Sequence, residues 1–203
     1  MALFSPRAEE PRDNRQVVSC PAFSSLMQEF SDEQKYRILD LGRARGGTVT
    51  YFSRFRCKLF VADVIPDILS YQESLPEDEP PELMLQEMIG LDDLSELDLV
   101  LCWDILNYLD APMIETFSTS LRQLMRNGGH LHAFINTRSE MPAFPGSYQI
   151  LDAGQMDVEH QAGNRISAPR FAQRNLREMM REFEIKHSRL LQSGMQEYSF
   201  YCL

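Results

Sequence analysis

Several features that mark common classes of protein are scarce or absent in this sequence. There are only four cysteines, Cys20, Cys57, Cys102 and Cys202, and none stands in a CxxC pair. This spacing indicates neither a zinc site nor a disulfide framework, and it favours buried thiols in a reducing compartment. The sequence has no apolar run long enough to span a bilayer, and its first residues lack the pattern of a secretory signal. We therefore predict a cytoplasmic protein that makes no contact with a membrane.

Basic residues are also few. The chain has 20 Lys and Arg against 30 Asp and Glu, which gives a formal net charge of −10 at pH 7. Such a chain repels a phosphate backbone, and the sequence shows no local Lys/Arg cluster to compensate. We expect no nucleic-acid partner. The eleven methionines do not pair with histidines at ligand spacing, so we expect no metal site.

The length of the chain favours a single domain. At 203 residues and 43% hydrophobic content, the chain is long enough to bury one core. Residues 1–22 are charged, contain proline and lack periodicity, so we predict a flexible N-terminal tail. Residues 23–203 then form the domain.

Apolar runs of strand length alternate with segments of helical periodicity. The predicted strands are 37–42, 58–64, 83–88, 97–104, 128–136, 184–191 and 195–203, and the predicted helices include 46–56, 65–72, 111–127 and 170–183. The last two strands are joined by the short turn 192–194, which is typical of a hairpin. We predict an α/β three-layer sandwich with a mostly parallel seven-stranded sheet and an antiparallel C-terminal hairpin strand.

A long insert separates the fifth strand from the last helix. It covers about residues 138–170, and its segments 148–151 and 156–160 have the pattern of an accessory hairpin. A substrate lid and a plain decorative loop are equally good interpretations of this insert.

A glycine-rich turn follows the first of these strands. Gly42 comes two residues after Asp40 and permits a tight turn, and Gly46 and Gly47 open the next helix so that backbone amides can approach a ligand. In parallel sheets, ligands bind at the carboxyl ends of the strands where the strand order reverses. The spacing does not match the GxGxxG of dinucleotide-binding folds. From the residues alone, Asp40 is expected to orient the turn by accepting amide hydrogen bonds.

The stretch "ILDLGRARGG" resembles the DxGxGxG motif of class I S-adenosylmethionine-dependent methyltransferases, with Ala44 in the place of the middle glycine. The segments "LFVADV", "LDLVLCWDILNYLD" and "LRQLMRNGGHLHAFIN" are similar to that family's later segments, in the same order. The resemblance covers most of residues 36–137, and "FAQRNLREMMREFEIKHSRLL" is similar to the usual closing helix and strand. It implies a Rossmann-like fold and S-adenosylmethionine as the cofactor.

The resemblance also implies roles for particular residues. The implied cofactor-binding set is Asp40, Gly42, Ala44, Gly46, Asp63 and Asp104. In it, Asp63 binds the ribose hydroxyls, although a plain strand-end cap is the alternative, and Asp104 either contacts the cofactor's amino group or caps a turn. The candidates at the acceptor mouth are Asn107 and Tyr108, and those for the adenine amino group are Glu87, Asp92 and Asp93.

Other residues near these segments have simpler interpretations. Trp103 and His132 are interpreted mainly as packing residues. Arg43 and Arg45 leave the cofactor pocket open if their side chains point to solvent. If either points inward, it fills the pocket or pairs with the cofactor's carboxylate.

Two functions follow from these patterns. The first is methyl transfer from S-adenosylmethionine to a small-molecule or protein acceptor, a reaction that needs alignment and desolvation but no covalent intermediate. The second is a catalytically inactive methyltransferase-fold scaffold or regulatory protein, which Ala44 and the two arginines favour. The sequence identifies neither the acceptor nor the oligomeric state.

Overall fold

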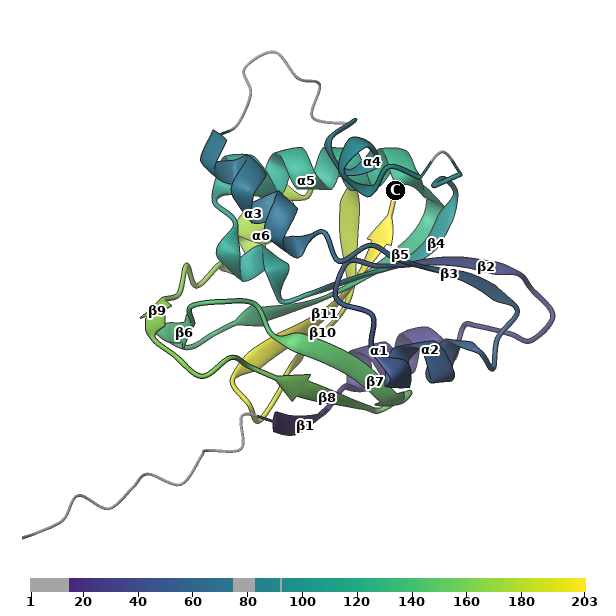
Figure 1. Cartoon of the computed structure of the whole chain (residues 1–203), viewed down its shortest axis with the longest axis horizontal. Coiled ribbons are helices and arrows are strands. Elements are labelled where there is room, and N and C mark those ends of the chain that lie inside the picture. The colour runs from purple at the N-terminus through teal and green to yellow at the C-terminus, as the bar shows by residue number, and fades with distance from the viewer. Residues whose placement is uncertain (1–14, 75–82, 92) are drawn as a thin grey trace, which may run out of the picture.

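A six-stranded mixed sheet forms the centre of the computed structural model, which describes residues 15–74, 83–91 and 93–203 (Figure 1). Its strands are β2 (Tyr36–Asp40), β3 (Cys57–Val61), β4 (Leu97–Trp103), β5 (Met125–Asn136), β10 (Phe183–Leu190) and β11 (Met195–Cys202). The order across the sheet is β10-β11-β5-β4-β2-β3. The strands β2 to β5 are parallel, whereas β11 runs antiparallel to both β5 and β10. The predicted α/β class with a mixed sheet is confirmed.

Helices cover both faces of this sheet. The helices α3 (Ile65–Ser74), α4 (Met84–Ile89), α5 (Ala111–Leu124) and α6 (Gln173–Met179) lie on one face, and α1 (Pro21–Met27) and α2 (Gly46–Phe52) lie on the other (Figure 1). Alternate residues of β4 enter the two cores: Val100 and Cys102 pack with the first layer, and Leu99 and Leu101 pack with the second. All seven residues of β4 are buried, as the continuous apolar run predicts.

The strand predicted at 83–88 is wrong, because this segment forms α4. Its apolar residues at 84, 85, 88 and 89 follow helical rather than alternating spacing, and Gly90 closes the helix in the left-handed region at φ 62°. Met84 and Leu85 are buried in the core of the first face. The sheet therefore has six strands instead of seven.

The predicted tail is too long. Residues 15–19 form the strand β1 (Arg15–Ser19), and α1 begins at Pro21. The buried carboxylate of Glu197 accepts hydrogen bonds from the backbone amides of Ala22 (2.8 Å) and Phe23 (2.9 Å), which fixes the start of α1 to β11. Residues 1–14 lie outside the described part of the chain.

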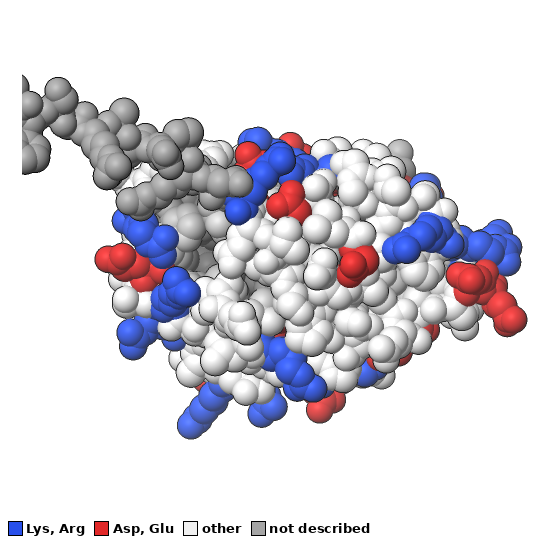
Figure 2. Space-filling view, turned by 90° about the horizontal axis from the view of Figure 1, so that it is seen from below, with Lys and Arg blue, Asp and Glu red and all other residues white. Residues whose placement is uncertain are grey.

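The insert builds two small sheets of its own. Its strands are β6 (Glu140–Pro142), β7 (Ser147–Asp152), β8 (Gln155–Glu159) and β9 (Arg165–Ser167). The predicted hairpin is confirmed by the antiparallel pairing of β7 and β8, and β1 adds to it as a third strand. The domain therefore has other sheets besides the predicted one, because the insert pairs with the N-terminal strand rather than with the central sheet. Seen from below, the molecule shows a broad, mostly uncharged surface with a few isolated Asp and Glu side chains, and several Lys and Arg side chains lie around a hollow towards one end (Figure 2).

Several helix boundaries differ from prediction: α2 ends at Phe52 rather than at residue 56, and α3 extends to Ser74 rather than ending at residue 72. Asp110 caps α5 by accepting a hydrogen bond from the Met113 amide (2.9 Å), but the helix ends at Leu124, and residues 125–127 belong to β5. The helix α6 is also shorter than the predicted 170–183. Within the described ranges, no helix is both long and apolar enough to cross a membrane.

Candidate functional site

The glycine turn at the end of β2 is organised by Asp40. Its Oδ1 accepts hydrogen bonds from the Gly42 amide (2.9 Å) and from the Trp103 indole Nε1 (2.6 Å), which confirms its predicted role in orienting the turn. Its Oδ2 is buried and has no hydrogen-bond partner among the described residues. Burial raises the pKa of this carboxyl to about 6, although both hydrogen bonds oppose the shift.

An open cleft of about 590 Å³ lies at the carboxyl ends of β2 and β3. It is lined by the loop 42–45, Asp63, the first turns of α3, and the insert segments 144–148 and 159–161. The Asp63 carboxylate is 53% exposed, and its backbone is in the left-handed region at φ 48°. The structure therefore brings together Gly42, Ala44 and Asp63 from the predicted cofactor set. Gly46 begins α2 beside this loop.

The two arginines of the motif have different surroundings. The Arg43 side chain is exposed, and its Nε lies 3.9 Å from Asp63 Oδ1. Arg45 binds the insert: its guanidinium lies 3.3 Å from a Glu159 oxygen and 3.7 Å from an Asp157 oxygen, and it donates to the Ser147 hydroxyl (3.1 Å). Its hydrogen bond is the main cause that lowers the pKa of Glu159. Neither arginine fills the cleft; Arg45 fastens the insert to the glycine loop.

Trp103 fills the space directly above Gly42. A Cβ atom on Gly42 would lie only 2.7 Å from the indole Nε1 and 2.9 Å from Cδ1. The indole is 1% exposed and stacks on the Tyr148 ring (centroids 5.1 Å apart), which in turn stacks on Phe134 (5.3 Å). The indole therefore closes the side of Gly42 to which a Cβ atom would project, while the glycine turn also lines the open cleft.

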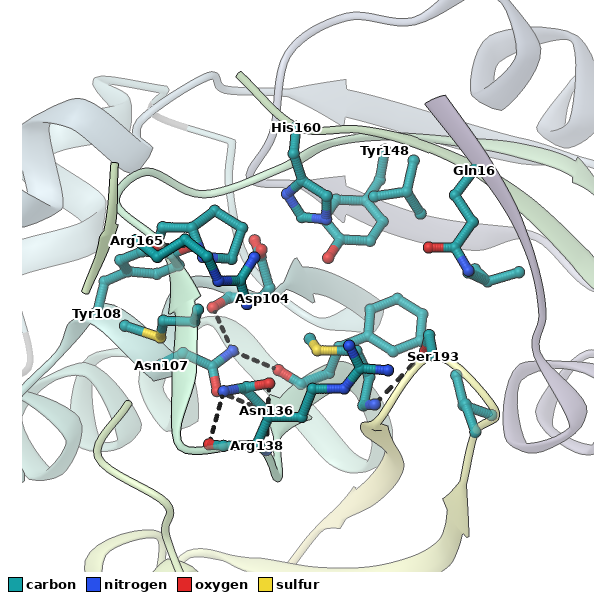
Figure 3. A pocket seen from close by; sticks show the side chains of 17 residues that line it. Gln16, Asp104, Asn107, Tyr108, Asn136, Arg138, Tyr148, His160, Arg165 and Ser193 are labelled. Carbon is teal, nitrogen blue, oxygen red and sulfur yellow. Dashed lines mark hydrogen bonds between the residues drawn. The ribbon is translucent and has the colours of Figure 1, made fainter. Parts of the chain in front are cut away.

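A second cavity, of about 150 Å³, lies on the other side of Tyr148 and His160, which line both spaces (Figure 3). Asp104 lines this cavity and is absent from the lining of the cleft. It is 2% exposed, and it accepts hydrogen bonds from the Gly146 amide (3.0 Å) and the Tyr148 hydroxyl. Burial raises the pKa of Asp104 to about 7.

The two predicted mouth residues hold loops in place. Asn107 donates to the backbone oxygens of Asp104 (2.8 Å) and Phe134 (2.9 Å), and its side-chain oxygen accepts from the Asn136 amide (2.7 Å). Tyr108 directs its hydroxyl at the carbonyls of Pro142 (3.2 Å) and Phe144 (2.8 Å) in the insert. Both residues line the second cavity, but their polar groups are already paired.

The remaining candidates lie away from the cleft. Glu87 is an exposed residue of α4, Asp92 lies outside the described residues, and Asp93 pairs with Lys58 (2.6 Å). His132 is fully buried and its Nε2 lies 2.9 Å from Glu197 Oε1, so its interpretation as a core residue is confirmed. The described residues contain no group of three or more His, Cys, Asp or Glu that could hold a metal ion.

Sequence reasoning missed three side chains that shape the site. Tyr148 and His160 come from the insert, and Arg138 follows β5. Their residue types were visible, but no spacing connects them with residues 40–45. Only the position of the insert, next to the strand ends, indicated that it would contribute.

Comparisons with known proteins are informative for the fold. No protein-family model matches the sequence, and no curated protein matches it. Among solved structures, the PH0226 protein of Pyrococcus horikoshii matches 88% of this chain and 86% of its own, with 10% sequence identity and a TM-score of 0.51.

Two further solved structures have lower TM-scores. One is the 1,6-didemethyltoxoflavin-N1-methyltransferase of Burkholderia thailandensis, crystallised with S-adenosylhomocysteine (17% identity, 90% and 76% coverage, TM-score 0.49). The other is a TehB-like methyltransferase of Corynebacterium glutamicum (12% identity, 90% and 88% coverage, TM-score 0.47). At these identities a likeness concerns the fold alone. The chain therefore shares the α/β fold of the PH0226 protein, a Rossmann-like arrangement around a mixed six-stranded sheet.

Proposed function

We propose that this chain binds S-adenosylmethionine in the cleft at the carboxyl ends of β2 and β3, and that it catalyses methyl transfer to a small acceptor. The observation that carries the proposal is that the glycine turn and Asp63 line one open cleft of about 590 Å³. The cleft lies where β2 pairs with β3 on one side and with β4 on the other, so the strand order reverses there. Bound in it, the cofactor supplies an electrophilic methyl group.

The nucleoside half of the cofactor fits the residues that line the cleft. The exposed carboxylate of Asp63 is available to accept hydrogen bonds from two ribose hydroxyls. Ile65 and Leu69 of α3, with Phe144 of the insert, provide apolar surface for the base. Among the described residues, Arg43 is the only cation within ion-pairing distance of Asp63, and the 3.9 Å contact is exposed and weak.

The methionyl half is assigned to the glycine turn, which lines the cleft at Gly42 and Ala44. The indole of Trp103 packs against Gly42 and donates to Asp40, so it limits the space beside this turn.

A second function is favoured by this same indole. The stack of Trp103, Tyr148 and Phe134, together with the fastening of Arg45 to the insert, suits a methyltransferase fold that has lost its cofactor and serves as a scaffold. The two functions differ in whether the purified protein binds S-adenosylmethionine.

Calorimetric titration with S-adenosylhomocysteine tests the proposal. We expect the wild type to bind, and Asp63→Asn to bind about 10-fold more weakly, because a charge-assisted hydrogen bond becomes a neutral one. Asparagine keeps the size of the side chain and tolerates the left-handed backbone at this position. The matched control is Asp67→Asn, since Asp67 is exposed in the first turn of α3 but does not line the cleft.

The outcomes separate the two functions. If the wild type does not bind S-adenosylhomocysteine at millimolar concentration, methyl transfer is excluded and the scaffold function is supported. If the wild type and Asp63→Asn bind S-adenosylhomocysteine equally well, the protein binds the cofactor but Asp63 does not bind its ribose.

A further inference from the structure

The second cavity combines apolar walls with three charged side chains, those of Asp104, Arg138 and Arg165. It lies between the ends of β4 and β5, the insert, and the turn that joins β10 to β11 (Figure 3). Its apolar lining includes Val18, Phe134, Met141, Tyr148 and Val158. A cavity of about 150 Å³ holds roughly one benzene-sized ring.

Arg138 supplies an unpaired cation. Arg138 is an exposed residue that also lines the cavity, and no described residue forms a hydrogen bond or an ion pair with its guanidinium. Figure 3 shows it on the opposite side of the cavity from His160 and Tyr148. A guanidinium without a protein partner at the wall of a cavity of mixed polarity is suited to bind an anion, because its paired N–H donors match the geometry of a carboxylate.

The position of Arg138 is built by its neighbours. Its stem packs on Gly194: a Cβ atom there would lie 3.0 Å from Cγ and 3.1 Å from Cδ, and Gly194 has a left-handed φ of 81°. The Asn136 side chain holds the backbone of Arg138, donating to its carbonyl (3.1 Å) and accepting from its amide (3.4 Å). These contacts involve the backbone and the aliphatic part of Arg138, so they position the side chain without neutralising its charge.

A second arginine stands at the cavity with its charge partly compensated. Arg165 is 50% exposed; it donates to the Glu140 carbonyl (3.0 Å), and its Nε lies 3.6 Å from the Glu140 carboxylate. Burial is the main cause that lowers the pKa of His160, and the charge of Arg165 lowers it further. Both effects favour the neutral imidazole of His160. Among the described residues that line the cavity, Asp104 is the acidic one.

We propose that this cavity binds a single-ring carboxylate that carries a hydroxyl group, with the carboxylate on Arg138 and the hydroxyl donating to Asp104. The apolar walls between these two residues hold the ring. This binding does not rest on the proposed function, because the cavity is separate from the cofactor cleft.

Calorimetric titration with 4-hydroxybenzoate in the absence of cofactor tests the proposal, with phenol as the neutral probe of similar ring size. The measurement is made about one pH unit above the pKa of Asp104, so that its carboxylate is charged. We expect the wild type to bind 4-hydroxybenzoate at least about 10-fold more tightly than phenol, and Arg138→Gln to remove this preference. Arg174→Gln, which changes an exposed arginine of α6, is the control and keeps the preference.

Three results overturn the proposal: equal affinity for the two probes, an unchanged preference in Arg138→Gln, or no binding of either probe at millimolar concentration. Thermal melting of each variant shows that it is folded. If the cavity proposal is overturned but the protein still binds S-adenosylhomocysteine, the proposed function is unaffected. The reverse pattern leaves an anion-binding cavity in a protein that does not bind the cofactor.

Discussion

At the scale of single residues, the most unusual group of the site is the carboxyl of Asp104. It is almost wholly removed from water at the end of β4, and burial raises its pKa from an ordinary value of 3.8 to about 7. The hydrogen bonds from Gly146 and Tyr148 lower the pKa but do not offset the burial. A buried carboxyl with a pKa near neutrality is typical of groups that exchange protons at functional sites.

This shift predicts how stability depends on pH. Because the folded pKa lies above the unfolded one, the contribution of Asp104 to folding is complete below about pH 4 and is lost as the pH rises to about 7. A shift of about three units corresponds to about 4 kcal/mol. We expect the free energy of unfolding of the wild type, measured with urea, to fall by about this much more than that of Asp104→Asn over this range. Parallel curves for the two proteins contradict the assignment.

Residues of the site differ in how far the sequence predicts them. The turn at Gly42 was predictable because Asp40 accepts the amide of a residue only two positions away. The indole on Gly42 was not, since it depends on the left-handed φ of 51° at Trp103 and on a stacking partner 45 positions later, Tyr148. The direction of the Arg45 side chain was not predictable, because its partners Asp157 and Glu159 come near it only in the folded insert.

At the scale of elements, the insert packs on α2 through a close backbone contact. A Cβ atom on Gly47 would lie 2.8 Å from the Ile150 carbonyl oxygen and 3.0 Å from the Gln149 Oε1 atom of β7. The Ile150 amide donates to the Thr48 hydroxyl (3.2 Å) at the same contact. The first turn of α2 is therefore covered by β7, so the second glycine of the pair serves the insert rather than a ligand.

A matched pair of substitutions tests this contact. We expect Gly47→Ala to lower the free energy of unfolding by about 1–3 kcal/mol, because the backbone of β7 must shift. Gly46→Ala meets no atom within 4 Å, and alanine is favoured over glycine in a helix by up to about 1 kcal/mol. We expect it to be neutral or stabilising in the same urea denaturation. Equal destabilisation by both substitutions contradicts the contact.

Helices and strands were predictable where a periodic apolar pattern extended over many residues. They were not predictable where a strand pairs with a segment far away in the sequence. The 14 residues of α5 and the seven buried residues of β4 carry strong patterns. The six residues of α4 do not, so a short apolar run was read as a strand. The strand β1 pairs with β8, whose residues lie about 140 positions further along the chain, and no local pattern indicates such a partner.

At the scale of the whole molecule, the fold gathers basic residues that the sequence disperses. A shallow cavity at the amino ends of the parallel strands is lined by five of them: Lys35, Arg37, Arg56, Lys58 and Arg126. Carboxylates already hold three of the five: Asp93 pairs with Lys58 (2.6 Å) and Arg37 (3.3 Å), and Asp98 pairs with Arg126. Basic residues therefore do not cluster in the sequence, as expected, but five of them do cluster on the surface of the folded protein. Carboxylates compensate three of these five positive charges.

The last prediction follows from this balance. Affinity for duplex DNA comes mainly from the release of counterions when free Lys and Arg groups neutralise phosphates. The cavity leaves Lys35 and Arg56 as cations without a carboxylate partner in the described residues, and the chain carries a net charge of −10. Two such groups against this charge are too few for stable binding at physiological salt.

We expect no change in the fluorescence anisotropy of a labelled duplex of about 20 base pairs at about 0.1 M salt, up to roughly 100 µM protein. Asp93→Asn is the informative variant. It frees Lys58 and Arg37, so weak binding that disappears with added salt is expected to emerge in it first. Binding by the wild type that weakens in Arg56→Gln would show instead that the amino-edge cavity is a nucleic-acid site and that local charge outweighs the net charge of the molecule.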